Sequence, residues 1–337
     1  MRQNKSDLVG VEKMKNAIID LHCDTILLAM NDRKNLKNWQ GHINIEKLKK
    51  GGCLAQCFAL FIPQNAELAE YHFADESPWG IYHTMLASYK DNLNLCSECL
   101  RPAYSAEDVM NNFRDGYISS ILTVEDGMLL DGKIDRTDEL YRDGVRMLAL
   151  TWNYENTIGF PNSPDQKLHT TRGLKDFGFE VIERMNTLGM IIDVSHLSEA
   201  GFMDVVRCSR KPFAASHSCC RSICGHQRNL TDKQLKMIGD CGGIVGVNFY
   251  SKFLADDSDD TLVESIVRHA EHIRNKAGID CVSWGSDFDG FDSRIEFDDY
   301  SGFPMLLDAL SRKFTDDEID KINSGNFLRV FREVQKQ

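Results

Sequence analysis

The most constraining feature of this sequence is a series of eight short apolar runs that recur between residues 17 and 285. Helical spacing fills most of the intervals, and such alternation is typical of parallel strands joined by crossover helices. Eight units in a chain of 337 residues favour a closed (β/α)8 TIM-like barrel over an open doubly wound sheet. No G-x-G-x-x-G pattern follows any run, so a dinucleotide-binding fold has no local support. The runs are 17–22, 52–62, 119–124, 145–150, 190–194, 212–215, 243–248 and 280–285.

The intervals between the runs carry helix start and stop signals. Helical spacing extends from about 66 to 95 with an expected break at Pro78, and Gly189 is expected to end a helix over 174–188. Thr231 and Thr315 are expected N-caps. Further helices are predicted over 136–143, 262–277, 302–312 and 315–333. We therefore expect one catalytic barrel domain over 17–337, preceded by an N-terminal arm over 1–16.

The charge balance excludes one class of partner. The chain has 39 Lys and Arg residues against 51 Asp and Glu residues, a formal net charge of -12, so nucleic acid is not an expected partner. No run approaches the roughly 18 apolar residues of a membrane span, and residues 1–16 lack the apolar segment of a signal peptide. We expect a cytoplasmic protein without a membrane partner, in which the 11 cysteines are reduced thiols.

Polar side chains with metal-binding chemistry follow the apolar runs. In a barrel of this type the chemistry lies at the carboxyl ends of the strands, where residues distant in sequence become neighbours. Three of the ten histidines fall directly at such positions. The residues at the expected strand ends are His22, Asp24, Glu125, Trp152, His196, His217, Tyr250 and Asp287.

This set of side chains favours a centre of two metal ions. Three imidazoles and two or three carboxylates exceed the three protein ligands that one catalytic zinc takes, but they suit two ions about 3.5–4 Å apart. A carboxylate must bridge such a pair, and Glu125 is the natural candidate because it stands alone at its strand end. A hydroxide held between the ions would be the nucleophile, since metal binding lowers the pKa of water toward about 7.

Several of the polar residues in the sequence have a purely structural interpretation. His196 and His217 could each bond a backbone group, and Glu125 could pair with a cation on a helix. Asp289 more naturally serves the Asp-Gly turn than the chemistry. The Cys96–Cys99 pair lacks the second half of a structural zinc site. The seven remaining histidines are interpreted as surface or loop residues: His42, His72, His83, His169, His226, His269 and His272.

Six motifs occur in order along the chain: Asp20–Asp24, Val124–Gly127, Asp193–His196, Ser216–Ser218, Arg228–Leu230 and Gly285–Gly290. Together they resemble the motifs of the membrane dipeptidase (renal dipeptidase) family of zinc metallopeptidases, and the chain looks like a soluble, bacterial-type member. The resemblance covers about residues 17–330. It implies a TIM-like barrel with two zinc ions per chain, and it allows a homodimer.

The resemblance also implies a role for each residue that matches a family motif. His22 and Asp24 would bind one zinc ion, His196 and His217 the other, and Glu125 would bridge them. Asp287 would pass a proton to the leaving amine. Arg228 would hold the carboxylate of the substrate, with Tyr250 lining the same pocket.

One position departs from the family. Animal members have a histidine, assigned to polarise the scissile carbonyl, where this chain has Trp152. An indole donates one hydrogen bond but carries neither a proton for transfer nor a charge. Polarisation would then rest on the metal ions or on Asn153, and we expect Trp152 to contact the substrate.

The sequence therefore predicts a metallo-dipeptidase that hydrolyses small dipeptides by attack of a metal-bridging hydroxide. The nearest alternative is another amidohydrolase reaction at the same site, on a lactam, a lactone or an acyl amino acid. A further alternative is a non-catalytic metal-binding barrel. The side-chain and stereochemical preference of the enzyme, its physiological metal and its oligomeric state stay open.

Overall fold

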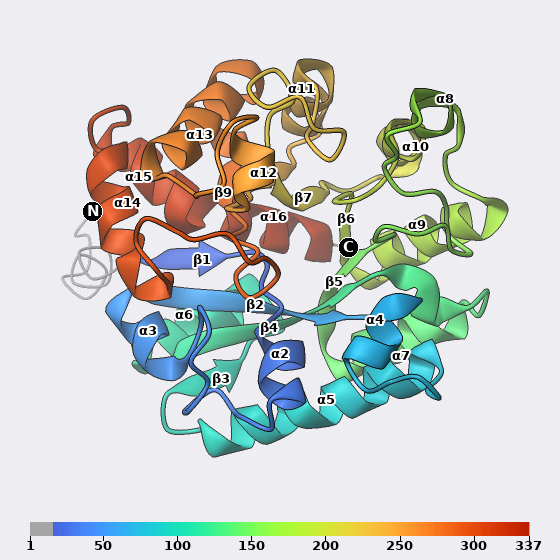
Figure 1. The fold of residues 1–337 in the computed structure, drawn as a ribbon, viewed down its shortest axis with the longest axis horizontal. Coiled ribbons are helices and arrows are strands. Elements are labelled where there is room, and N and C mark those ends of the chain that lie inside the picture. Colours follow the sequence, from blue (N-terminus) through green and yellow to red (C-terminus); the bar gives the residue numbers. More distant parts are fainter. Residues whose placement is uncertain (1–15, 337) are drawn as a thin grey trace, which may run out of the picture.

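The computed structural model describes residues 16–336, and its centre is a closed ring of eight parallel strands. The ring closes because β2 pairs with both β1 and β4, and β1 pairs with β9. Figure 1 shows helices surrounding these strands, as the barrel prediction requires. The strands of the ring are β1 (Ile18–Asp20), β2 (Cys53–Phe61), β4 (Ile118–Glu125), β5 (Val145–Ala149), β6 (Ile191–Asp193), β7 (Ala214–Ser218), β8 (Ile244–Val247) and β9 (Val282–Trp284).

All eight predicted strands are present, and a short ninth strand was not predicted. β3 (Leu100–Pro102) pairs with the first three residues of β4, whereas β5 pairs with the last four, so both strands share one edge of β4. β3 has only three residues and ends in a proline, which leaves no apolar alternation to detect. It stands outside the ring and does not alter the barrel.

The expected helix signals act at the expected places. α5 begins at Pro78, where the proline fits because a first-turn residue needs no backbone N–H donor. Gly189 ends α9 with φ 78°, a left-handed conformation that glycine adopts without steric cost. Thr315 and Glu318 form the predicted capping box at the start of α15.

The helices pack around the ring, and several of the shortest were not predicted. The α-helices are α2 (Thr25–Asn31), α3 (Ile45–Lys50), α4 (Ala66–Glu70), α5 (Pro78–Leu95), α6 (Ala106–Arg114), α7 (Asp135–Asp143), α8 (Gln166–Thr171), α9 (Asp176–Leu188), α10 (Glu199–Cys208), α11 (Asp232–Asp240), α12 (Ser251–Leu254), α13 (Val263–Ala277), α14 (Phe303–Leu310), α15 (Asp316–Asp320) and α16 (Asn326–Gln335). Single 3-10 turns η1 (Gly127–Leu130), η2 (Ile279–Cys281) and η3 (Tyr300–Gly302) and a π-helical turn η4 (Lys321–Gly325) complete the set.

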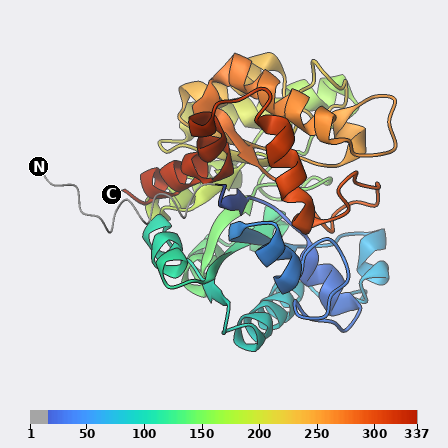
Figure 2. The same ribbon diagram turned by 90° about the vertical axis from the view of Figure 1, so that its left-hand side faces the viewer.

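The apolar core has two parts. The larger part lies between the outer faces of the strands and the surrounding helices. In the smaller part, Phe327 and Phe331 of α16 pack with buried strand residues such as Ile19, Ile121 and Met147. α16 therefore covers the amino-terminal end of the barrel, beside α6 (Figure 2), and leaves the carboxyl ends of the strands for the chemistry.

Two histidines do not fit the prediction of surface or loop positions. His269 of α13 is fully buried, with Nδ1 accepting from the backbone N of Cys220 and Nε2 facing the carbonyl of Leu254, both at 3.0 Å. His169 is also buried, beside Glu199. The prediction failed because a histidine on a helix gives no local sign of which neighbour will cover it.

Two other expectations meet the limits of the described chain. The predicted N-terminal arm over 1–16 lies outside the described residues except for Asn16. None of the helices in residues 16–336 combines the length and the apolar character needed to cross a bilayer.

Candidate metal centre

The carboxyl ends of the strands bring the predicted site residues together. Glu125 is the last residue of β4, and His217 lies within β7. His22 and Asp24 follow β1, His196 follows β6, and Asp287 follows β9. These ends meet because parallel strands of a closed barrel all finish at the same rim. The barrel thus gathers side chains that are more than 260 residues apart along the chain.

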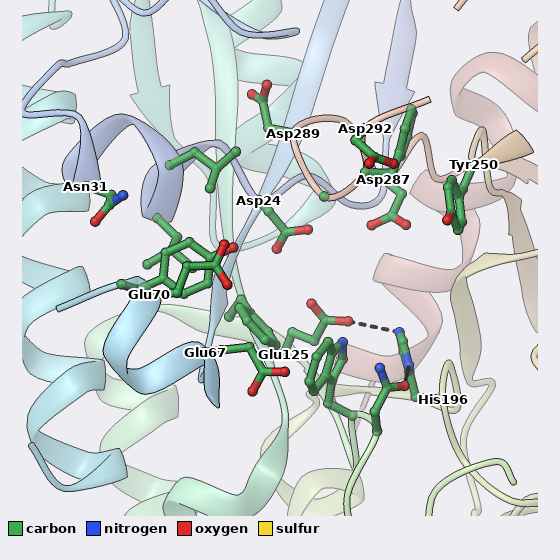
Figure 3. A pocket seen from close by; sticks show the side chains of 18 of the residues that line it. Asp24, Asn31, Glu67, Glu70, Glu125, His196, Tyr250, Asp287, Asp289 and Asp292 are labelled. Carbon is green, nitrogen blue, oxygen red and sulfur yellow. Dashed lines mark hydrogen bonds and ion pairs between the residues drawn. The ribbon is translucent and has the colours of Figure 1, made fainter. Parts of the chain in front are cut away.

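Glu125 lies between two groups of histidines. One carboxylate oxygen, Oε2, is 3.4 Å from Nε2 of His22. The other, Oε1, is 3.1 Å from Nε2 of His196 and 3.4 Å from Nε2 of His217. Figure 3 shows Glu125 pointing into the space shared by Asp24 and Asp287, with His196 on its other side. Glu125 therefore lies between His22 on one side and His196 with His217 on the other.

His196 and His217 present ring nitrogens to each other. Their Nε2 atoms are 3.0 Å apart, and the opposite ring atoms are held by Asn153 and Ser216. Nδ1 of His196 lies 3.0 Å from Oδ1 of Asn153, and an amide oxygen is only an acceptor, so that nitrogen carries the proton. Nε2 of His196 therefore has a free lone pair directed at the site.

Asp24 and Asp287 complete the other side of the centre. Oδ2 of Asp24 and Oδ1 of Asp287 each lie 3.7 Å from Nε2 of His22. Asn248 donates from Nδ2 to Oδ2 of Asp287 at 2.9 Å and thereby fixes its carboxylate. Ligand atoms of His22, Glu125 and His217, and again of His22, Asp24 and Asp287, lie within 4.8 Å of one another.

Two of the site residues have unusual backbone conformations. His196 and Asp287 adopt φ values of 65° and 64°, the left-handed region that non-glycine residues rarely occupy. Such conformations cost free energy and occur preferentially at functional sites. Both residues follow a strand, and their side chains reach Glu125 and His22 respectively.

The polar atoms of the centre fit metal ions. Nε2 of His22 and Oδ1 of Asp24 are buried and have no hydrogen-bond partner among the described residues. Buried polar atoms without partners are costly, and imidazole nitrogen with carboxylate oxygen is a donor set that zinc accepts. A cation beside His22 and Asp24 would satisfy both of these atoms, and a cation beside His196 and His217 would bind the nitrogens that face each other there.

The pKa shifts of the site residues are also consistent with a site for metal ions. Burial lowers the pKa of His196 and His217 well below the usual value, with Arg228 adding to the effect at His196, so both rings are neutral and able to coordinate. Burial raises the pKa of Glu125 to about 7 and raises that of Asp287. Burial alone would lower the pKa of His22, but Glu125 and Asp24 raise it well above the usual value. The carboxylates of Glu125 and Asp24 therefore favour positive charge at the position of the His22 ring.

A cavity of about 590 Å³ opens directly over the centre. Asp24, Glu125, His196 and Asp287 form its floor, and the aromatic wall includes Trp152, whose ring packs edge-on against Phe61 at 4.7 Å. Two further walls come from Tyr250, stacked on Phe291, and from α4, which carries Glu67 and Glu70 (Figure 3). Trp152 and Tyr250 therefore lie where a bound molecule would contact them, whereas the α4 carboxylates were not predicted.

Arg228 lies behind the histidines rather than in the wall of this cavity. Its guanidinium donates to Oγ of Ser218 and to the carbonyl of His217, both at 2.8 Å. Nε of Arg228 is buried and has no partner among the described residues. The structure thus brings Arg228 close to His217 but does not place it among the residues that line the cavity.

Asp289 joins several segments, beyond the turn that was expected for it. Its carboxylate accepts from Oγ1 of Thr25 at 2.6 Å, from Nε1 of Trp39 at 3.1 Å and from the backbone N of His42 at 2.6 Å. It therefore ties the loop that carries Asp287 to the start of α2 and to the segment after α2.

Sequence reasoning missed the buried residues that support the centre. Asp193 and Asp20 accept hydrogen bonds from Ser216 and Ser286, the residues before His217 and Asp287. A signal was present, because each aspartate stands two or three residues before a site histidine at the end of a strand.

Comparison with known proteins gives a consistent family. The family described as "Membrane dipeptidase (Peptidase family M19)" matches residues 12–337. A Klebsiella pneumoniae protein described as an uncharacterized protein in the pqqA 5' region is 36% identical over 77% of this chain and 98% of its own length. Dipeptidase tcpJ of Claviceps purpurea is 29% identical over 89% of this chain and 71% of its own length.

A solved structure is similar over nearly the whole chain. The metallo peptidase of Rhodobacter sphaeroides, liganded with a phosphinate mimic of the dipeptide L-Ala-D-Ala, superimposes with a TM-score of 0.86. The two sequences are 27% identical, and the match covers 95% of this chain and 99% of the other.

Proposed function

Because this chain belongs to the membrane dipeptidase family of metallopeptidases, we propose that it hydrolyses dipeptides at a centre of two zinc ions. Family membership makes the chain a metal-dependent dipeptidase and confirms the predicted family. The identity and number of the metal ions and the roles of individual residues are the content of the proposal.

The observation that carries the proposal is the division of the Glu125 carboxylate between two groups of ligands. His22 and Asp24 would hold one ion beside Oε2, and His196 and His217 would hold the other beside Oε1. A site for one ion would not need a carboxylate with a histidine within 3.5 Å of each oxygen.

When bound, the pair of zinc ions would supply a hydroxide nucleophile at neutral pH and polarise the scissile carbonyl. Asp287 would transfer a proton to the departing amine. Its raised pKa, caused first by burial, brings the carboxyl closer to the pH at which a group both takes up and releases a proton. Asn248 holds Oδ2 of Asp287, which leaves Oδ1 directed toward His22 and the centre.

The cavity would bind the rest of the dipeptide. Trp152 and Tyr250 offer aromatic surface for side chains, and the α4 carboxylates give the opposite wall a negative charge. Arg228, whose buried Nε has no partner among the described residues, would attract the substrate carboxylate by its charge from behind the histidines, outside the wall of the cavity. The ligand of the Rhodobacter sphaeroides structure, a dipeptide mimic, supports a substrate of this size.

Metal analysis together with a panel of substrates tests the proposal. We expect about two zinc ions per chain, cleavage of free dipeptides, and loss of cleavage when the carboxylate of the dipeptide is converted to an amide. Fewer than one tightly bound ion with no dipeptide cleavage on adding zinc would overturn it. Preferential hydrolysis of a lactam, a lactone or an acyl amino acid would instead assign a different amidohydrolase substrate.

A further inference from the structure

A buried chain of hydrogen bonds lies beneath His217. Asp193, the last residue of β6, accepts at Oδ1 from the backbone N of Ser195 at 2.9 Å and of Ser216 at 2.8 Å. Its other oxygen, Oδ2, accepts from the hydroxyl of Ser216. The same hydroxyl oxygen lies 2.7 Å from Nδ1 of His217. Asp193, Ser216 and His217 are each at most 2% exposed, so water does not compete for these bonds.

The direction of each bond follows from the donors available. A carboxylate only accepts, so the single hydroxyl proton of Ser216 goes to Asp193. Ser195 Oγ accepts from the backbone N of His217 at 3.2 Å, so its own proton is free to point at Ser216, also 3.2 Å away. The oxygen of Ser216 can therefore only accept from the imidazole, and Nδ1 of His217 must carry the proton.

This proton position determines what His217 offers to the centre. A neutral imidazole with its proton on Nδ1 has a lone pair on Nε2. In the metal-free protein this lone pair faces Oε1 of Glu125 at 3.4 Å and the lone pair on Nε2 of His196 at 3.0 Å, with no proton between them, so a cation between these atoms would relieve their repulsion.

We propose that Asp193 is a positioning residue that acts through Ser216, because the chain of bonds fixes His217 in the Nδ1-protonated tautomer and aims Nε2 at the metal centre before any metal binds. The inference rests on the metal-binding part of the proposed function. It adds that one half of the centre is preorganised by a buried carboxylate that touches neither metal nor substrate.

The chain offers a matched control on the opposite side of the barrel. Asp20, at the end of β1, accepts from the backbone N of Ser286 at 2.7 Å and from its hydroxyl at 2.6 Å. Ser286 contacts no imidazole nitrogen through any hydrogen bond of the described residues; its oxygen accepts from the backbone N of Phe288 instead. Ser286→Ala therefore removes the same kind of bond without a route to His217.

The decisive test is the tautomer of His217 in the Asp193→Asn variant. Oδ1 of the asparagine keeps both backbone bonds, and its amide donates to Ser216, which then donates to Nδ1 of His217 and moves the proton to Nε2. Nitrogen NMR of imidazole-labelled, metal-free, full-length protein shows directly which ring nitrogen of His217 carries the proton. We expect Nδ1–H in the wild type and in Ser286→Ala, and Nε2–H in Asp193→Asn. A wild type in which His217 carries its proton on Nε2, or an Asp193→Asn variant in which the tautomer of His217 is unchanged, would overturn the inference.

Zinc titration against a competing chelator gives the second measurement. Asp193→Asn should weaken one of the zinc sites by about 10- to 100-fold, as loss of a supporting group does at other metal sites. A folded Asp193→Asn variant that changes tautomer yet binds zinc like the wild type would contradict the inference. Should Asp193→Asn not fold, Ser216→Ala serves instead, since it removes the acceptor of Nδ1 and should yield a mixture of tautomers.

The two proposals fail differently. A wild type that binds no zinc would refute the two-zinc function, whereas the tautomer of the metal-free protein still decides the role of Asp193. Normal zinc binding with an unaffected tautomer in the variant would refute only the role of Asp193.

Discussion

Oε1 of Glu125 lies 3.1 Å from Nε2 of His196, on the side of the carboxylate that faces away from His22. The two oxygens of one buried side chain thus face different histidines, Oε2 facing His22 and Oε1 facing His196 and His217. Glu125 contacts histidines in both halves of the centre, which also meet where the rings of His22 and His217 stack at 3.8 Å, so changing Glu125 should affect both halves.

We predict that Glu125→Gln lowers zinc binding and activity together. The amide keeps the shape of the side chain but offers one acceptor oxygen instead of two, so it cannot bridge two cations. Zinc affinity, measured by chelator competition, should fall by more than the roughly 10- to 100-fold typical of changes outside the ligand shell. Glu67→Gln, in the wall of the same cavity, is the control and should retain both zinc ions. Unchanged stoichiometry in Glu125→Gln would refute a bridging role.

We predict that Asp287→Asn keeps the metal and loses turnover. The asparagine is nearly the same size but has no proton to exchange, and general acid catalysis contributes about 10²- to 10⁴-fold. Measurement of kcat alongside zinc content separates the two effects. Asp292→Asn changes another carboxylate of the cavity and should leave kcat within a few-fold of the wild type. Equal turnover in Asp287→Asn would remove this residue from the mechanism.

We predict that Trp152→Ala acts mainly on KM. The indole packs against Phe61 and lines the cavity, so its loss removes contact area that substrate and transition state share. KM should rise by about tenfold, equivalent to about 1.4 kcal/mol, with a smaller change in kcat. Trp152→Phe keeps an aromatic wall, so its KM should lie between that of the wild type and that of Trp152→Ala. A fall in kcat alone would instead indicate that the indole N–H acts on the reacting groups.

We predict that His269 makes the folded state sensitive to acid. Burial lowers its pKa to about 4, from 6.5 in the unfolded chain. Below pH 6.5 the unfolded state therefore binds more protons than the folded state. The contribution of His269 to the free energy of unfolding is complete above about pH 6.5 and is lost as the pH falls toward 4, a total loss of about 3 kcal/mol.

Urea unfolding at pH 7.5 and 5.5 measures the effect of His269. The wild type should lose about 1.3 kcal/mol more between these two values than His269→Gln, which has no titrating ring. The comparison of the two proteins cancels the contributions of His196 and His217, whose lowered pKa values act in the same direction. Parallel pH dependence in both proteins would contradict the prediction.

The strand-end residues could be found in the sequence because the barrel obeys a simple rule. A buried strand is a short apolar run, and the polar residue that follows it marks the rim where the chemistry lies. This rule placed His22, Glu125, His196 and Asp287 in one centre without knowledge of any distance. It did not apply to β3, whose three residues carry no pattern, or to the α4 carboxylates, which reach the cavity from a helix.

The sequence by itself determined the barrel, the family and the residues proposed for the metal centre, because hydrophobic periodicity and motif order are local properties of the chain. Only the tertiary structure decided how these residues act on one another. Three features depend on contacts between strands and helices distant in sequence. The two oxygens of Glu125 face different histidines, Ser216 links Asp193 to His217, and His269 is buried. Such contacts leave no periodic signal, since their geometry is fixed only when the ring closes.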